Sequence, residues 1–320
     1  MAIVVAVRPG HRNAAALAWA GVLAASIDEP VVAAAVVLVP AGVPSPLRDG
    51  MADADFFDLI AVDAFDEARA ALGDALTATV AIGARSVRAG LLDLLERRGA
   101  THLVLGSADG GTPGRTRVGD VASALLHAAT VPVHLAPVGY PGSGIDVGST
   151  SAPSDGSGSN EALGRGEASV APRSIRRVTV AFGSGDGSRQ ALELGARLAD
   201  RADSMLRVAT FFIRGNGSAS LIASQGYGAQ IATAWREQME GTLDGAIRGL
   251  ASLGLPTRFV SADFGDGATW RDALGAIDWV PGELLIVGSR PRGGPIRTFL
   301  GSSAAEILGE STVPVMVLPS

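Results

Sequence analysis

The chain of 320 residues contains no cysteine, and its 26 basic residues are all arginine, so lysine is absent as well. Without cysteine the chain can form no disulfide, no thiolate zinc site and no cysteine nucleophile. Without lysine it has no Walker-type phosphate lysine and no Schiff-base chemistry. Composition alone therefore excludes whole classes of enzyme.

Positive charge is scarce, and no long apolar run is present. The formal net charge is -6, the sequence pI is near 5.3, and no basic stripe stands out, so no nucleic-acid partner is expected. The apolar run at residues 31–39 is too short to span a bilayer and ends at Pro40, so no membrane partner is expected either. A strand pattern begins within the first seven residues and leaves no room for a signal peptide, which predicts a cytoplasmic protein.

Histidine is rare, and its spacing suits neither a metal nor a nucleophilic site. The four histidines all lie in the first half of the chain: His11, His102, His127 and His134. Since none of them has the spacing of metal ligands, no metal site is predicted. His102 and His134 fall in or beside predicted strands, where hydrogen-bonded structural histidines are expected. Ser107 and Ser289 lack a histidine-and-acid arrangement, so no serine nucleophile is predicted.

What the sequence does contain is an internal repeat. The segment LVLGS at residues 103–107 returns as LIVGS at residues 285–289, an offset of 182 residues (288 − 106). The same offset, without any gap, pairs Gly119 with Gly301 and the segment VPV at residues 131–133 with that at 313–315. A match over some thirty residues that includes loop glycines indicates a duplication.

Each half begins with a buried-strand pattern, at residues 3–7 and 178–182, and continues with alternating helices and strands. In the first half, helices are expected at residues 13–27, 52–72 and 86–98 and strands at 31–39, 77–82 and 102–105. In the second half, helices are expected at 188–201, 228–253 and 270–277 and strands at 206–212, 257–261 and 284–287. Both halves close with a further helix and strand.

This alternation predicts the α/β class, with two tandem five-stranded, parallel, doubly wound sandwiches. The domains are expected at residues 1–138 and 175–320, joined by a flexible Gly/Ser-rich linker at 139–174. Pro132 and Pro314 stand at the start of the last strand of each half. Since proline lacks the N–H that a central strand needs there, we expect both strands at sheet edges.

The fourth strand of each half leads to Gly-Ser, then to a glycine loop, and then to the next helix before Val-Pro-Val. In this pattern after the fourth strand, and in its N-terminal strand followed by alternating strands and helices, the chain resembles the universal stress proteins. The resemblance covers nearly the whole chain, twice. The resemblance implies the adenine nucleotide alpha hydrolase-like fold, two domains related by a pseudo-twofold axis, and a non-catalytic role in the stress response. It also implies ATP as the ligand, held by the pattern G-x-x-G-x(9)-G-[ST] at a helix N-terminus.

The second half keeps most of that pattern. Gly288, Gly301 and Ser302 match it, whereas Pro291 replaces the second glycine and Gly293 follows closely. Arginines cluster in this loop, where their planar fork suits a phosphate or an acidic partner, although a solvated loop explains them equally well. The resemblance gives these candidate nucleotide-binding residues: Gly183, Val287, Gly288, Ser289, Arg290, Gly293, Gly301, Ser302 and Ser303.

The first half departs further, because Asp109 and Asp120 replace the second glycine and the terminal Ser/Thr. Like charges about 4 Å apart repel by roughly 1 kcal/mol in water and roughly 4 kcal/mol at intermediate dielectric. That repulsion exceeds the roughly 0.3 to 1 kcal/mol that a helix dipole offers an anion. Asp120 is better explained as a carboxylate that stabilises its own helix.

An aspartate that contacts the nucleoside in the family is replaced by Arg8 in the first half and by Gly183 in the second. The degenerate first site therefore comprises Arg8, Gly106, Ser107, Asp109, Gly119 and Asp120, and ATP binding is expected in the second half alone.

Two other functions stay open. A structural or interaction module without a nucleotide would explain why each half breaks the loop pattern. An α/β oxidoreductase is suggested by Gly183, Gly185 and Gly187 after a strand, but their spacing is G-x-G-x-G rather than G-x-G-x-x-G and no catalytic acid-base set accompanies them. Weak ATP hydrolysis is left open. The two halves are expected to form an intrachain pseudo-dimer, while a homodimer and an unidentified protein partner are further alternatives.

Overall fold

The computed structural model describes residues 1–39, 53–140, 172–183, 186–214, 228–252, 254–255, 259–291, 298–299 and 301–319. The linker predicted at residues 139–174 lies mostly outside this described part, as do Gly293 and Gly185. No helix in the described ranges is both long enough and apolar enough to cross a membrane.

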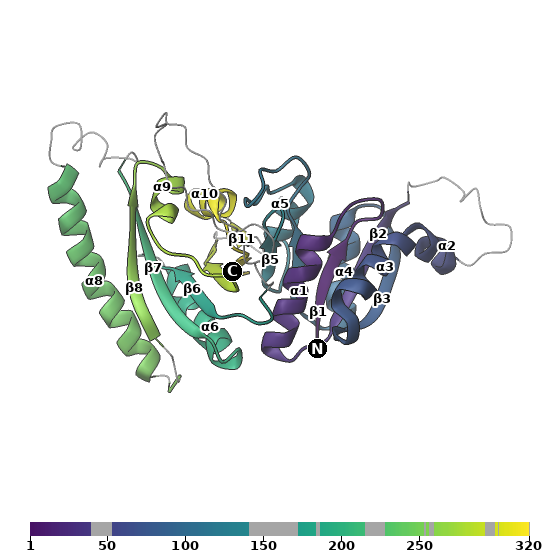
Figure 1. Cartoon of the computed structure of the whole chain (residues 1–320), viewed down its shortest axis with the longest axis horizontal. Helices are drawn as coiled ribbons and strands as arrows, with labels where there is room; N and C mark the ends of the chain where they lie inside the picture. The colour runs from purple at the N-terminus through teal and green to yellow at the C-terminus, as the bar shows by residue number, and fades with distance from the viewer. Residues whose placement is uncertain are drawn as a thin grey trace, which may run out of the picture.

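The first half follows the alternation expected from its sequence (Figure 1). Its elements are β1 (Ala2–Val7), α1 (Ala14–Ile27), β2 (Val31–Leu38), α2 (Asp53–Ile60), α3 (Val62–Leu72), β3 (Leu76–Ala84), α4 (Val87–Arg98), β4 (Ala100–Gly106), α5 (Asp120–Leu126) and β5 (Val133–Ala136). The single helix predicted at residues 52–72 is wrong in one respect, since α2 and α3 are separate helices that meet at Ala61. Ala61 is fully buried at this junction.

The second half repeats the order with one addition. Its elements are β6 (Arg177–Ala181), α6 (Asp186–Arg201), β7 (Met205–Ile213), α8 (Gly228–Ser252), β8 (Phe259–Gly267), α9 (Trp270–Gly275), β9 (Glu283–Val287), β10 (Arg290–Pro291), β11 (Thr298–Phe299), α10 (Ser302–Glu310) and β12 (Val315–Val317). The addition is the short antiparallel pair β10–β11, which the sequence did not predict.

The ten long strands form one sheet, in the order β3-β2-β1-β4-β5-β12-β9-β6-β7-β8. Each half contributes five parallel strands in the same internal order, which confirms the predicted fold class. The halves meet where β5 and β12 pair antiparallel, with His134 opposite Met316 at the centre of the register. Because these two residues are repeat equivalents, a pseudo-twofold axis passes between them.

The prediction that the proline-led strands lie at sheet edges is therefore wrong for the whole chain. β5 and β12 are each the last strand of their own half, but each covers the edge of the other. Pro132 and Pro314 precede the two strands, and their carbonyl oxygens accept hydrogen bonds from Leu103 and Leu285. The missing proline N–H groups thus fall outside the paired residues.

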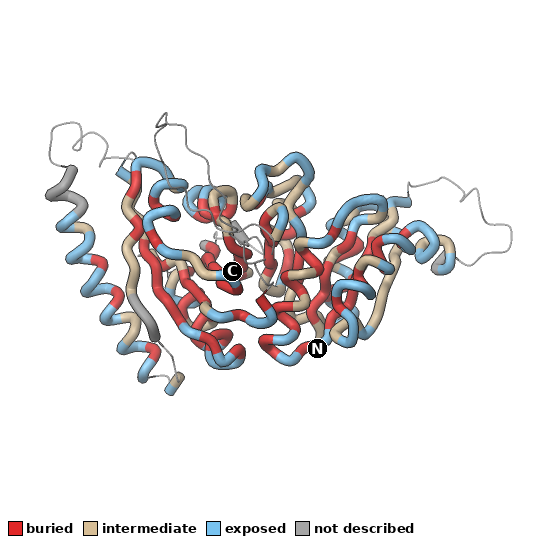
Figure 2. The backbone as a smooth tube through the Cα atoms, viewed as in Figure 1, coloured by how far each residue is buried: buried red, intermediate tan, exposed pale blue. Residues whose placement is uncertain are grey.

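The core fills both faces of the sheet, as Figure 2 shows by the buried strands running through the middle of the molecule. Residues of α1, α3, α6 and α8 pack on one face, and residues of α4, α5, α9 and α10 pack on the other. This explains why the inner strands read as near-continuous apolar runs. Each fully buried Leu, Ile or Val contributes about 1.5 to 3 kcal/mol.

The two halves are also joined away from the sheet. Glu29, buried at the end of α1, accepts a hydrogen bond from Arg201 of α6 at 2.8 Å. The Ser26 hydroxyl accepts a bond from the main-chain N–H of Ile175 at 2.8 Å. These contacts join the end of α1 to the end of α6 and to the segment that leads into β6.

Candidate functional sites at the strand exits

The strand order places one candidate site in each half. In a parallel sheet of order 3-2-1-4-5, the direction of winding reverses between strands 1 and 4, and ligands bind beyond the carboxyl ends of those strands. We call the loops after β1 and β4 the first exit site, and those after β6 and β9 the second exit site. Gly106 ends β4 and Gly288 follows β9, so the repeat glycines stand at matching strand ends.

The first turn of α6 and the exit of β9 are in close contact at the second exit site. A Cβ atom on Gly187 would overlap the carbonyl oxygen of Ser289, and one on Gly288 would overlap the carbonyl oxygen of Gly187. Only glycine permits this approach of two main chains. Next to it, Ser289 is 3% exposed, and its hydroxyl has no hydrogen-bond partner among the residues that the structure describes.

Helix α10 begins at the same site, and no described side chain caps its first main-chain N–H groups. Its N-cap residue is Gly301. Ser302 and Ser303 form the first turn and are exposed. The first amides of a helix have no partner within the helix, and the helix dipole adds partial positive charge there, so this end suits an anion.

The remaining residues predicted for the second site fall around these. Val287 is the last residue of β9 and is buried. Gly183 follows β6, and its main-chain N–H donates to the Ser188 hydroxyl at 3.0 Å. Arg290 opens β10 opposite Phe299 of β11, and its side chain lies outside the described atoms.

The serine of the first exit site is already hydrogen-bonded within its own loop. The Ser107 hydroxyl, the counterpart of Ser289, accepts the main-chain N–H of Arg117 at 2.7 Å and donates to the carbonyl oxygen of the same residue at 3.4 Å. Gly119 is the N-cap of α5 and Asp120 is the first residue of that seven-residue helix. Asp120 is therefore where a carboxylate stabilises the first helical turn, as expected from the sequence.

The Asp109 carboxylate is paired with an arginine. The expectation that both Asp109 and Asp120 stand as unpaired carboxylates at the phosphate position is therefore wrong for Asp109. Its Oδ2 accepts a hydrogen bond from Arg8 Nη2 at 2.5 Å, and His11 Nδ1 lies 3.6 Å from the same oxygen. This hydrogen bond lowers the pKa of Asp109, and the positive charges of Arg8, His11 and Arg117 lower it further. Sequence reasoning missed the pair because Arg8 and Asp109 are 101 residues apart.

Three side chains, Trp19 of α1, His134 of β5 and His102 of β4, form a hydrogen-bonded chain in the interior. Trp19 Nε1 donates to His134 Nδ1 at 3.1 Å, and His134 Nε2 lies 3.0 Å from His102 Nδ1. Since indole only donates, His134 carries its proton on Nε2 and donates it to His102. Burial lowers the pKa of His102 to about 4 and that of His134 well below its usual value. The prediction of hydrogen-bonded structural histidines is confirmed.

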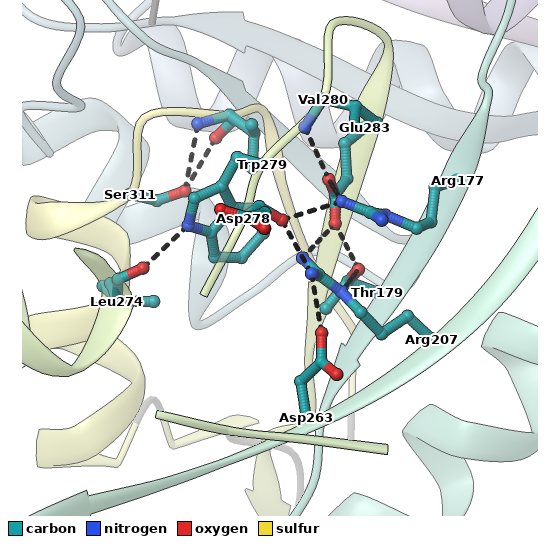
Figure 3. A network of polar contacts seen from close by, with 11 residues as sticks. Arg177, Thr179, Arg207, Asp263, Leu274, Asp278, Trp279, Val280, Glu283 and Ser311 are labelled. Atoms are coloured by element: carbon teal, nitrogen blue, oxygen red, sulfur yellow. Dashed lines mark hydrogen bonds and ion pairs between the residues drawn. The ribbon is translucent and has the colours of Figure 1, made fainter. Parts of the chain in front are cut away.

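A buried charge network occupies the opposite, amino end of the second half's strands (Figure 3). Glu283 is fully buried and accepts from Arg207 at 2.5 Å, from Arg177 at 2.7 Å and from the Thr179 hydroxyl. Arg207, 1% exposed, also bonds to Asp263 and to the carbonyl oxygen of residue 278, and it stacks over the ring of residue 279. Each charge is paired, so this network is structural and separate from the exit sites.

No group of three or more His, Cys, Asp or Glu side chains in the described ranges is placed to hold a metal ion.

Comparison with known proteins matches residues 1–137 and 174–319 to the universal stress protein family. The chain is 31% identical over 236 residues to universal stress protein Rv2319c of Mycobacterium tuberculosis (strain ATCC 25618 / H37Rv), covering 73% of this chain and 70% of that protein. Universal stress protein Mb2346c of Mycobacterium bovis matches to the same extent.

Among solved structures, a universal stress protein from Archaeoglobus fulgidus DSM 4304 aligns with a TM-score of 0.56 and 15% identity, covering 99% of this chain and 98% of that one. The functionally unknown protein PA1789 from Pseudomonas aeruginosa PAO1 aligns with a TM-score of 0.54 and 15% identity, covering 99% and 92%. At this level of identity the structural matches support the two-domain fold.

Proposed function

Because the chain belongs to the universal stress protein family, with a copy of the family's domain in each half, we propose that it is a non-catalytic, cytoplasmic stress-response regulator that binds an adenine nucleotide in its second half alone. The second exit site would hold the phosphates, through the main chain at Gly288, the Ser289 hydroxyl and the first turn of α10. The first exit site would hold no nucleotide.

The observation that carries this proposal is the difference between two equivalent serines. Ser107 and Ser289 follow the same strand of the repeat, yet Ser107 already accepts and donates hydrogen bonds with the main chain of Arg117, whereas Ser289 is buried and its hydroxyl has no partner among the described residues. An unpaired buried hydroxyl costs about 1 to 3 kcal/mol unless something bonds to it. A phosphate oxygen at the uncapped end of α10 would supply that partner.

The charge difference between the sites points the same way. Asp120 and Ser302 are repeat equivalents at the first position of α5 and α10. A carboxylate at that position occupies the favourable end of the helix dipole and repels a phosphate, whereas a serine does neither and can donate a hydrogen bond.

Isothermal titration of the full chain with ATP and Mg²⁺ tests the proposal. We expect one nucleotide per chain, and Ser302→Asp, which installs the residue of the first half, is expected to weaken binding at least about tenfold. Asp120→Ser is the matched control and is expected to leave the affinity and the stoichiometry unchanged. Absence of heat at millimolar ATP, together with no nucleotide retained in native mass spectrometry, would refute nucleotide binding.

That negative result would favour the second candidate, an interaction module without a nucleotide. The contact between Gly187 and the exit of β9 favours this candidate, because it brings the first turn of α6 against the strand exit that a nucleotide would need. Gly183 also offers no carboxylate to a nucleoside. Binding of a nicotinamide or flavin cofactor in a thermal-shift screen would instead support the oxidoreductase alternative.

A further inference from the structure

Two arginines and a histidine of the first exit site lie against one aspartate of the same chain. Arg8 and His11, from the β1–α1 loop, both approach Oδ2 of Asp109, at 2.5 and 3.6 Å. Arg117, from the far side of the β4–α5 loop, donates through Nη1 to the main-chain oxygen of Asp109 at 2.7 Å. The side chains of Arg8, His11 and Asp109 are 49%, 48% and 70% exposed, so the cluster is open to solvent.

Hydrogen bonds to Asn13, which is itself bonded to Glu67, hold the loop that carries Arg8 in place. The buried Asn13 side chain accepts the main-chain N–H of Arg8 at 2.8 Å and donates to the carbonyl oxygens of Arg8 and His11. Glu67 of α3 in turn accepts bonds from the main chain and the side chain of Asn13 at 3.0 to 3.1 Å. Binding sites need such a supporting shell, whereas a surface ion pair does not.

The second half has the same loop without these charges. Gly183 donates to Ser188 as Arg8 donates to Asn13, which shows that Gly183 and Arg8 stand at equivalent positions. By the repeat, Asp109 corresponds to Pro291 and Arg117 to Phe299. The set Arg8, Asp109 and Arg117 therefore has no counterpart at the same positions of the second half, whose loop arginines stand at other positions.

We propose that the first exit site is an anion site for a small phosphate-type dianion rather than a nucleotide, and that the chain fills it with its own Asp109 until such an anion displaces that carboxylate. Guanidinium groups bind phosphate and carboxylate oxygens with the same geometry, and a dianion carries more charge than Asp109. Arg8 bonds to the carboxylate of Asp109 and Arg117 bonds to its main-chain oxygen, so guanidinium groups from two different loops meet at this residue. The lowered pKa of Asp109 keeps this internal occupant ionised.

The four histidines provide a probe that reports on the first half alone, because the second half contains none. We suggest following the ring signals of His11 by NMR in the full chain while inorganic phosphate is added at neutral pH, with His11→Gln to assign them. The variants are Asp109→Asn, which removes the internal anion, and the double variant Arg8→Gln with Asp109→Asn. Asp93→Asn is the matched control, since it removes an exposed carboxylate that pairs with Arg97 on α4 and does not touch Arg8.

We expect Asp109→Asn to bind phosphate about tenfold more tightly than the native chain, because a tethered carboxylate competes at a high effective concentration. Asp93→Asn is expected to behave as the native chain, and the double variant is expected to lose the gain. The proposal is overturned if Asp109→Asn and the native chain respond alike, if Asp93→Asn gains as much, or if the double variant binds as well.

The proposal does not depend on nucleotide binding by the second half, and the same probe separates the two. ATP bound at the second exit site produces heat without moving the His11 signals. If ATP moves the His11 signals of Asp109→Asn at lower concentration than phosphate does, the first site accepts a nucleotide, and its assignment to a small anion is wrong.

Discussion

Single residues decide whether the same position in the two halves is charged or apolar. Thr179 lies opposite Arg207 in the β6–β7 register, just as Val4 lies opposite Val32 in the β1–β2 register. The complete set of equivalents pairs Thr179, Arg207, Asp263 and Glu283 with Val4, Val32, Val80 and Thr101. The fold therefore forms equally well without the buried charges, and stability in the second half depends on keeping them together.

Replacing Glu283 alone by threonine, the residue of the first half, is expected to destabilise the protein by about 3 to 5 kcal/mol. The change removes the buried carboxylate that Arg177 and Arg207 share and leaves Arg207 with the partly exposed Asp263 as its remaining acidic partner. The fourfold change Thr179→Val, Arg207→Val, Asp263→Val and Glu283→Thr is expected to recover most of that loss. Urea unfolding measures both. A cost below about 1 kcal/mol for Glu283→Thr would contradict the claim that burial makes this pairing obligatory.

The buried histidines predict a loss of stability in acid. Both pKa values are lowered in the folded chain, to about 4 for His102 from an ordinary 6.5. The folded state thus holds the rings neutral while the unfolded chain takes up protons below about pH 6.5. Their contribution is complete above pH 6.5 and is lost as the pH falls toward 4, by about 3 kcal/mol for His102.

The measurement is the urea midpoint at several pH values between 7 and 4, for the native chain and for His102→Leu with His134→Met. These substitutions bring in the residues that the second half has at the same positions, Leu284 and Met316. The double variant is expected to be less stable at neutral pH, because Trp19 loses its acceptor, but to depend less steeply on pH. Equal slopes would show that other groups cause the acid sensitivity.

At the scale of elements, the glycines at the exits of β4 and β9 differ in how closely the neighbouring helix, α1 or α6, approaches them. Gly288→Ala is expected to destabilise the chain by about 1 to 3 kcal/mol, since its Cβ would overlap the main chain of Gly187. Gly106→Ala is the matched control, because its Cβ would lie 3.7 Å from the nearest atom, on Ala16, and a change within about 0.5 kcal/mol is expected. Thermal unfolding distinguishes the two, and an equal loss would refute the close approach.

Elements are also the scale at which the sequence was most informative. Buried parallel strands are long apolar runs, so β2, β7 and β9 were predicted from residues close in sequence. The break at Ala61 was missed because both α2 and α3 have helical periodicity. The contact between Arg8 and Asp109 was missed for another reason: residue patterns carry no information on which exposed charges of distant loops meet.

At the scale of the whole molecule, the halves act as one sheet. The last strand of each half covers the open edge of the other, and an open edge would otherwise expose unpaired main-chain groups. Glu310, at the end of α10, accepts ion pairs from Arg115 of the first half and from Arg271 at 3.0 Å each. Helix α10 therefore begins at the second exit site and ends against the β4–α5 loop of the first.

If the joint between the halves is made mainly by main-chain and apolar contacts, cutting the chain between them should not separate them. We expect a chain with a protease site inserted after residue 155 to elute from a sizing column, after cleavage, at the volume of the uncut chain. Denaturing electrophoresis would verify the cut. The cut halves should still co-elute in about 1 M salt, where exposed ion pairs such as that of Arg201 are screened and the β5–β12 hydrogen bonds are not. Separation in high salt alone would mean that ion pairs hold the halves together, and separation in both conditions would mean that the linker does.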